Sequence, residues 1–323
     1  MPIIVKTGTV TPPPVIPPPP ALPRLGPALA MTWRAPDSTE VPLTRRELGW
    51  RLLVKGLKGL GAPATEITAD PLADGGELVL NTWTGHRLIL LPIRIGGSTP
   101  QQFDDRFDQL ADWFGQTADL GPGTLEVARP GGRRRQIRAY LQDGFDDDAR
   151  GTGHVAATVL VTLYCPTAWF ADVEPIEVPW RYSGGGARFL GTVGGRRYPA
   201  LSPGRALGDT TAVNPGKVPS YGLWTLTGPA ATLTATSARL GGATFTLDLP
   251  RAILAGEQVT IDTDPLVSAV TGPAGEDWTG SLNWPGADLW PLMPGTNKIS
   301  LVVTGSGVGT AVSLAFAPLY RSA

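Results

Sequence analysis

The stretch HVAATVLVTLYC, residues 154–165, decides the fold class of this chain. Apolar side chains occupy every second position from Val155 to Cys165, which places them on one face of an extended strand. Pro166 follows directly, and proline cannot donate a hydrogen bond to a continuing ladder. A strand of this kind is typical of a β-sheet with one buried face.

Short runs with the same alternation recur through the second half of the chain. They are GLWTLTG (222–228), ATLTATS (231–237), ATFTLDL (243–249), EQVTIDT (257–263), KISLVV (298–303) and AVSLAFAP (311–318). The 41 glycines and 33 prolines of the chain favour turns between short strands. Several short alternating strands separated by turn residues predict a β-sandwich, so we expect a mainly β protein.

One segment, residues 98–115, has the periodicity of an α-helix instead. Its apolar residues recur at intervals of three and four and form one stripe, which consists of Phe103, Phe107, Leu110 and Phe114. Thr99 is a suitable N-cap, and Pro100 fits the first helical position, where a backbone donor is not needed. Gly115 favours the end of the helix. We expect the stripe to pack the helix against the first domain.

Two segments in the first half predict β-hairpins. Residues 76–97 hold two apolar runs separated by NTWTGH, and Pro92 in the second run indicates an edge strand or a bulge. Residues 123–145 have the pattern of two strands around a Pro-Gly-Gly turn. Local charge balance favours a solvated hairpin over a phosphate site for its arginines, which are Arg133, Arg134, Arg135 and Arg138.

The chain divides into an arm and two domains. Residues 1–27 form the arm, and the run TPPPVIPPPPALPRLGP (11–27) predicts an extended, polyproline-like segment. This arm is either stiff and solvated or placed on a neighbouring subunit. We place a boundary near residue 173, which separates a first domain, residues 28–173, from a second, residues 174–323.

The charge and the cysteine content exclude some classes of protein. The 27 Lys and Arg residues nearly balance 28 Asp and Glu, whereas a dedicated nucleic-acid binder would carry a strong basic excess. The single cysteine, Cys165, cannot form an intrachain disulfide, and its alternation with apolar residues predicts a buried thiol. We find no signal peptide pattern and no apolar run long enough to span a bilayer. We therefore expect synthesis in a cytoplasm and no membrane insertion.

Residues that could perform catalysis or bind a metal do not form a recognisable set. His86 and His154 lie in separate strand segments without partners at metal-ligand spacing. The carboxylates that could pair as in a glycosidase are Asp262, Asp264, Glu276 and Asp277. Asp262 falls at a strand end, however, where an aspartate usually bonds its own backbone. We expect neither an enzyme nor a cofactor.

Three tryptophans near the end of the chain raise a different question. Trp278, Trp284 and Trp290 could form a surface on which sugar rings stack, or they could pack a long loop onto the edge of the sandwich. Packing is favoured, since large apolar side chains are mostly buried. Pro294 and Gly295 follow and fit positions i+1 and i+2 of a type II turn.

Several segments together resemble a known family. In the first half they are GLKGLGAPATEITADPLADGGELVL (56–80), RLILLPIRIGG (87–97), the helix that follows, and VTLYCPTAWFAD (161–172). In the second half they are NPGKVPSYGLWTLTGP (214–229), AGEQVTIDT (255–263), DLWPLMPGTNKISL (288–301) and AFAPLYRSA (315–323). In this order and spacing they resemble the distal tail protein (Dit) family of long-tailed, non-contractile phages, especially those that infect actinobacteria.

The resemblance implies a belt-type β-sandwich with one α-helix and a hairpin in the first domain, and a galectin-like β-sandwich in the second. The belt domains would assemble as a homo-hexamer, a ring with a lumen for DNA at the distal end of the tail. The ring would join the tail tube protein to the tail-tip hub or tail-associated protein and to receptor-binding components. Its function would be structural, without a cofactor or sequence-specific binding of nucleic acid. A carbohydrate-binding module for host cell-wall glycans is the alternative.

The resemblance also suggests roles for the tryptophans. It indicates a structural clasp formed by Trp290, Pro294 and Gly295 in the outer domain. Trp278 and Trp284, in the looser loop upstream, are then the candidates for contact with a glycan or a partner. The proline-rich arm is not part of the family pattern. The loop region 181–213 is also longer than the family suggests, so it could hold host-specific contacts.

Overall fold

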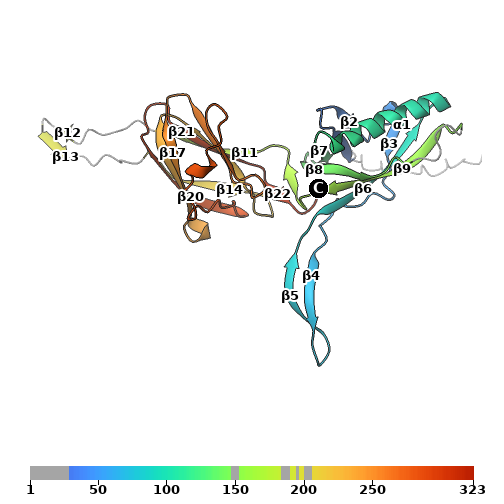
Figure 1. The fold of residues 1–323 in the computed structure, drawn as a ribbon, viewed down its shortest axis with the longest axis horizontal. Helices are drawn as coiled ribbons and strands as arrows, with labels where there is room; N and C mark the ends of the chain where they lie inside the picture. The colour runs from blue at the N-terminus through green and yellow to red at the C-terminus, as the bar shows by residue number, and fades with distance from the viewer. Residues whose placement is uncertain (1–28, 147–152, 183–189, 194–195, 200–205) are drawn as a thin grey trace, which may run out of the picture.

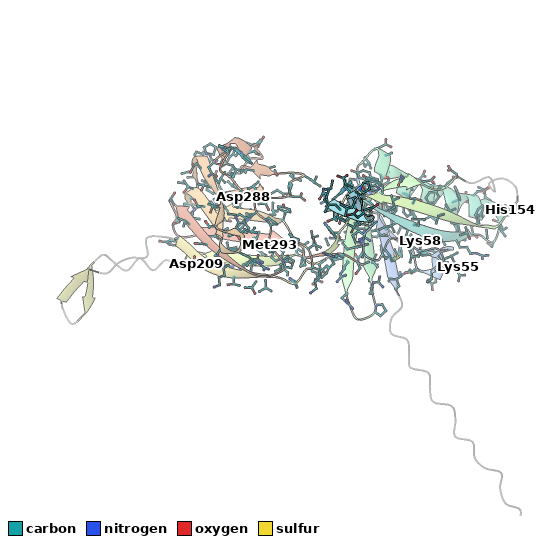
Figure 2. All side chains as sticks on the ribbon, turned by 90° about the horizontal axis from the view of Figure 1, so that it is seen from below. Lys55, Lys58, His154, Asp209, Asp288 and Met293 are labelled. Carbon is teal, nitrogen blue, oxygen red and sulfur yellow. The ribbon has the colours of Figure 1, made fainter. Side chains whose placement is uncertain are left out.

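The computed structural model describes residues 29–146, 153–182, 190–193, 196–199 and 206–323, so the proline-rich arm lies outside it. Two β-rich units lie side by side along the long axis of the molecule, and a narrow hairpin projects from the first unit (Figure 1). Seen from below, the units remain separate lobes, with Lys58 on the first and Asp209 on the second (Figure 2). The prediction of a mainly β fold is confirmed, and α1 (Pro100–Gly115) is the one α-helix of the described residues.

The first unit is built on a nine-stranded antiparallel sheet. Its main path runs β2-β1-β7-β8-β9-β6-β3, while β10 pairs with both β8 and β22. Its strands are β1 (Ala30–Arg34), β2 (Glu40–Pro42), β3 (Trp50–Leu52), β6 (Arg87–Gly96), β7 (Gly123–Ala128), β8 (Arg134–Asp143), β9 (Ala156–Cys165), β10 (Phe170–Asp172) and β22 (Leu319–Tyr320). Two 3₁₀ turns, η1 (Arg46–Leu48) and η2 (Gln116–Ala118), connect these elements.

Helix α1 seals the core of this unit. The Thr99 side chain accepts a hydrogen bond from the N–H of Gln102 at 3.2 Å, and a proline occupies the first turn. The four apolar stripe residues are fully buried, and Phe114 stacks on Trp33 with ring centroids 4.7 Å apart. The helix therefore contributes its whole apolar face to a core that β1 also lines.

The hairpin predicted within residues 76–97 is wrong. Strand β5 (Glu77–Trp83) pairs with β4 (Glu66–Pro71), and β6 pairs with β9 and β3. The turn of the hairpin that does form contains Gly75 and Gly76, both with positive φ. Turn-forming residues flank β5 on both sides. Only the long-range pairing of β6 with β9 decides on which side the hairpin forms.

Pro92 lies in an interior strand, so the expectation of an edge strand or a bulge is also wrong. Its carbonyl accepts a hydrogen bond from the N–H of Leu53 at 2.8 Å, while Leu90 exchanges hydrogen bonds with Lys58. The N–H and C=O of one residue in an antiparallel strand point to the same neighbour. The donor that Pro92 lacks would therefore point to the place where residues 54–57 leave the sheet, beyond the end of β3 at Leu52.

The hairpin predicted for residues 123–145 is confirmed by the pairing of β7 with β8. We had expected all four of its arginines to be solvated, but one of them is not. Arg135 is buried, its guanidinium lies 3.6 Å from the ring centroid of Tyr320, and it donates to the carbonyl of Ser322. These contacts come from a segment 185 or more residues further along, which no local pattern of charges could indicate.

The second unit is a β-sandwich, which confirms that prediction. A five-stranded sheet in the order β11-β21-β15-β18-β19 faces a four-stranded sheet in the order β14-β20-β16-β17. The first consists of β11 (Ile176–Arg181), β15 (Gly222–Thr227), β18 (Gln258–Asp262), β19 (Ala269–Thr271) and β21 (Ala311–Phe316). The second consists of β14 (Ala206–Asn214), β16 (Ala230–Ser237), β17 (Ala243–Ile253) and β20 (Gly295–Thr304). Smaller elements are η3 (Ala238–Leu240), η4 (Thr279–Ser281) and the pair β12 (Leu190–Val193) and β13 (Arg196–Pro199).

Aromatic rings form the centre of the sandwich core. Trp224 stacks on Trp180 at 5.7 Å between ring centroids and meets Trp290 edge-on at 5.6 Å. Phe245 packs edge-on against the same ring at 5.8 Å. The indole nitrogens of Trp180 and Trp290 are buried without a hydrogen bond in the described structure, so both rings act as apolar bodies.

A segment at the far end of the sequence returns to the first unit. Strand β22 pairs with β10, and Ala323, which is buried in the first core, donates to the carbonyl of Leu60 at 3.0 Å. The buried Arg87 donates to carbonyl oxygens of Gly61, Ala168 and Arg321, each at 2.7 Å, and also to that of Gly59. One guanidinium thus joins three separate parts of the chain.

We expect Arg87→Lys to lower the free energy of unfolding by about 2–3 kcal/mol, because an ammonium group cannot reproduce the fork of donors and leaves buried carbonyls unpaired. Urea denaturation measures this difference. Arg138→Lys, at an exposed position of β8, is the matched control and should change the stability by less than about 0.5 kcal/mol. Equal stabilities for the two variants would contradict the role of Arg87.

Trp290 gives a second test of the sandwich core. Trp290→Ala should cost about 3–5 kcal/mol, whereas Trp290→Phe should cost about 1–2 kcal/mol, because it removes no hydrogen bond. Thermal or urea denaturation distinguishes them. Trp284→Ala, at a side chain that is 53% exposed, serves as the surface control. A Phe variant as unstable as the Ala variant would show that the indole N–H has a partner.

Candidate assembly interface

The hairpin of β4 and β5 carries a group of exposed apolar side chains on the first unit. All residues of β5 are exposed, and the two strands pair only with each other among the described elements. The exposed apolar side chains of the hairpin are Ile67, Leu72, Leu78, Val79, Leu80 and Trp83. Successive residues of a strand point to opposite faces, so the run from Leu78 to Leu80 makes both faces apolar. A two-stranded hairpin is marginally stable alone, which suggests that another surface covers it.

The three tryptophans near the end of the second unit do not share one surface. Trp290 is buried in the sandwich core, with 3% of its surface exposed. Trp278 is half-buried, and the guanidinium of Arg251 lies 5.8 Å from its ring centroid. Trp284 is exposed, and its indole N–H donates to the carbonyl of Thr279 at 3.2 Å. Of the three, only Trp278 and Trp284 remain available for an external contact, and that contact stays a prediction.

The segment that contains Pro294 and Gly295 leads directly into β20. Gly295 has φ of +89°, the left-handed region that position i+2 of a type II turn requires. The buried side chain of Asn297 fixes this turn, because it donates to the carbonyl of Met293 at 2.8 Å and accepts from the N–H of Met293 at 3.0 Å. None of the sequence patterns above pointed to Asn297, although asparagine near a turn is a known signal for such a bond.

The four carboxylates considered for a glycosidase pair all make hydrogen bonds within local turns. Each accepts a hydrogen bond from a backbone N–H two residues away, at 2.8–3.0 Å; they are Asp262, Asp264, Glu276 and Asp277. Hydrogen bonds from Thr279 lower the pKa of Asp277. In the part of the chain that the structure describes, no three His, Cys, Asp or Glu side chains are grouped as a metal site would require. This geometry favours local turn formation over paired acid–base chemistry.

Comparisons with known proteins agree with this architecture. No protein-family model and no curated protein matches the chain. Among solved structures, the Dit protein of phage SPP1, described as a paradigm of the hub adsorption apparatus in phages that infect Gram-positive bacteria, superposes with a TM-score of 0.60. The match covers 91% of this chain and 99% of that one at 12% sequence identity. The chain has the distal tail protein fold.

Two further structures with the same fold belong to the baseplate of phage P2 in its activated conformation, one with Ca and one with Sr. Each matches with a TM-score of 0.55 and 10% identity, over 90% of this chain and 98% of the other. The distal tail protein fold expected from the sequence is therefore confirmed, while the actinobacterial host stays a prediction. Among the described residues, no helix has the length and apolar character needed to cross a bilayer.

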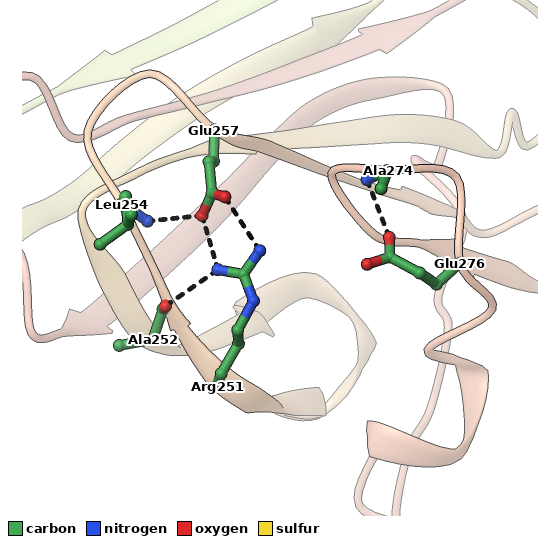
Figure 3. A network of polar contacts seen from close by, with 6 residues as sticks. All are labelled: Arg251, Ala252, Leu254, Glu257, Ala274 and Glu276. Atoms are coloured by element: carbon green, nitrogen blue, oxygen red, sulfur yellow. Dashed lines mark hydrogen bonds and ion pairs between the residues drawn. The ribbon is translucent and has the colours of Figure 1, made fainter.

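In the second unit of this distal tail protein fold, Arg251 links two loops. Its guanidinium makes a two-pronged ion pair with Glu257, with N–O distances of 2.7 and 2.9 Å (Figure 3). Glu257 also accepts a hydrogen bond from the N–H of Leu254 at 2.7 Å. The arginine, and then the Leu254 N–H, lower the pKa of Glu257 to about 2. Arg251 therefore joins the β17–β18 turn to Trp278.

Removal of Arg251 should raise the pKa of Glu257 from about 2 towards its ordinary value of 4.5, while the Leu254 N–H keeps it below that value. The folded-state pKa is depressed, so the ion pair stabilises the fold above pH 4.5 and this contribution disappears as the pH falls towards 2. NMR titration of Glu257 in Arg251→Ala measures the shift. Arg239→Ala, which removes an arginine that bonds Thr296 instead, should leave the pKa of Glu257 unchanged. An unchanged pKa in Arg251→Ala would contradict this account.

Proposed function

We propose that the chain is a structural protein of a phage tail tip, which assembles as a homo-hexameric ring. The observation that carries this proposal is the apolar β4–β5 hairpin, which extends away from its own core. The fold supports it, because the structures that share the fold over nearly the whole chain come from the hub adsorption apparatus of SPP1 and from the baseplate of P2.

In the proposed ring, each hairpin packs on the first unit of the next copy. Such an interface is heterologous, and a heterologous contact forms a closed ring when the rotation between copies closes. Burying the hairpin would remove apolar side chains such as Leu78 and Leu80 from water, which is the main driving force for association. It would also cover the open edges of a two-stranded element.

The ring would join the tail tube protein to the tail-tip hub or tail-associated protein, with receptor-binding components outside and a lumen for DNA inside. The near balance of 27 basic and 28 acidic residues suits a lumen through which DNA passes, because clustered lysine and arginine would hold the phosphates. We retain the division into an arm (1–27), a belt domain (28–173) and a galectin-like domain (174–323), with β22 returning to the belt. The carbohydrate-binding alternative loses its three-tryptophan surface, because Trp290 is buried.

The ring is tested by mass measurement and electron microscopy of the purified chain, which should show six-fold particles. The double variant Leu78→Asp, Leu80→Asp should abolish the rings and leave the melting temperature unchanged, because both side chains are about half exposed and lie away from either core. Leu266→Asp, at a leucine of the second unit that is 77% exposed, should assemble normally. A chain that stays monomeric at high concentration would overturn the proposal.

A further inference from the structure

The sheet of the first unit has an apolar outer face. Strands β6 and β9 pair along their whole lengths, and residues opposite one another share a face of the sheet. The face turned away from the core carries Leu88, Leu90, Leu160 and Tyr164. Helix α1 packs on the other face, so Leu88 remains 39% exposed and Leu160 remains 49% exposed. This outer sheet face is a second apolar surface of the first unit, besides the hairpin.

Basic side chains border the outer sheet face. Arg94 continues the outward series of β6, and Arg51 of β3 is paired directly opposite it. Lys58 is paired opposite Leu90 in an isolated bridge, which places its side chain on the same face. Within the described part of the chain, none of the three forms an ion pair. Like charges directly opposite each other in a sheet are destabilising, so a carboxylate from another molecule would relieve the repulsion between Arg51 and Arg94.

One face of the β4–β5 hairpin has the complementary composition. The register of the two strands places on one face the residues Ile67, Asp70, Leu78 and Leu80. The three apolar side chains among them are 54–62% exposed. Residues 59–86, which include the hairpin, contain four carboxylates and no lysine or arginine. The hairpin is therefore apolar and acidic, whereas the outer sheet face is apolar with a basic border.

The two surfaces also match in length. Strand β5 has 7 residues, and β6 and β9 have 10 residues each. At roughly 3.3 Å per residue, β5 spans about 23 Å and the outer sheet face about 33 Å, so the hairpin fits on the face. The hairpin projects away from its own sheet (Figure 1), and the face that it can cover is therefore that of another copy.

We infer that the β4–β5 hairpin of one copy docks on the outer sheet face of the next copy. The apolar side chains of the hairpin lie against Leu88 and Leu160 of the neighbour. Asp70 then lies beside the neighbour's pair of like charges, Arg51 and Arg94. This contact rests on the proposed ring and specifies which surface receives the hairpin. Because the hairpin and the receiving face are different surfaces, every copy can both give and receive one contact, as a closed ring requires.

Leu160→Asp and Arg94→Glu test the receiving face in the full-length chain. Each should raise the protein concentration needed for half assembly by about tenfold or more, because the first removes an apolar contact and the second reverses a charge. Leu120→Asp, at a leucine of the first unit that is 64% exposed and follows the helix, should assemble like the parent chain. Analytical ultracentrifugation measures assembly, and circular dichroism confirms that each variant is folded.

Cross-linking between two copies identifies the contact directly. A chain with Leu80→Cys is mixed with a differently tagged chain with Leu160→Cys and treated with a short thiol-to-thiol cross-linker. Burial raises the pKa of the native Cys165 thiol to about 12, so Cys165 should not react in the folded protein. The mixture should give pairs with one chain of each kind, whereas each variant alone should give few pairs. The parent chain controls for reaction at Cys165.

The receiving face and the ring fail in distinguishable ways. Rings that form normally in both Leu160→Asp and Arg94→Glu, or a mixture without cross-linked pairs of the two cysteine variants, would overturn the receiving face and leave the ring intact. The hairpin would then dock on a different surface if Leu78→Asp, Leu80→Asp still abolished the rings. A parent chain that stays monomeric would overturn the ring and this contact together.

Discussion

The buried guanidinium of Arg87 is the interaction on which the arrangement of the chain depends. It is 4% exposed and is satisfied by backbone carbonyls from the 59–61 turn, from Ala168 and from Arg321. A buried charge is tolerated only when its donors are paired, so these segments must stay together for the fold to be stable. Gly59 permits the close approach, because an added Cβ there would collide with the carbonyl oxygen of Leu88. The base of the hairpin and the return of β22 are thereby fixed to one point.

Apolar side chains are buried in the two cores but exposed on the hairpin that extends from this fixed point. The two cores bury their largest aromatic rings, among them Trp33 and Trp224. The β4–β5 hairpin leaves both of its faces exposed instead. An apolar surface held away from its own core by a rigid base is suited to a contact between proteins. The proposed ring uses a surface of this kind.

In the second unit, two tryptophans close together in the sequence have opposite environments. Trp290 and Trp284 lie six residues apart, yet the first is buried against Trp224 and the second is exposed. The turn at Gly295, held by the Asn297 side chain, leads the chain into β20 directly after Trp290. The expectation that these tryptophans pack within the domain, and do not form a surface for sugar rings, agrees with the buried position of Trp290.

Elements with a local pattern could be predicted from the amino-acid sequence alone. The alternation before Cys165 and the stripe from Phe103 to Phe114 depend only on the periods of a strand and a helix, so both could be predicted. The folded chain is needed to see which strand pairs with β6, why Pro92 is tolerated inside a sheet, and that Arg87 and Arg135 are buried. Those outcomes depend on contacts between residues far apart in the chain, and their energies exceed the local preferences that a sequence pattern expresses.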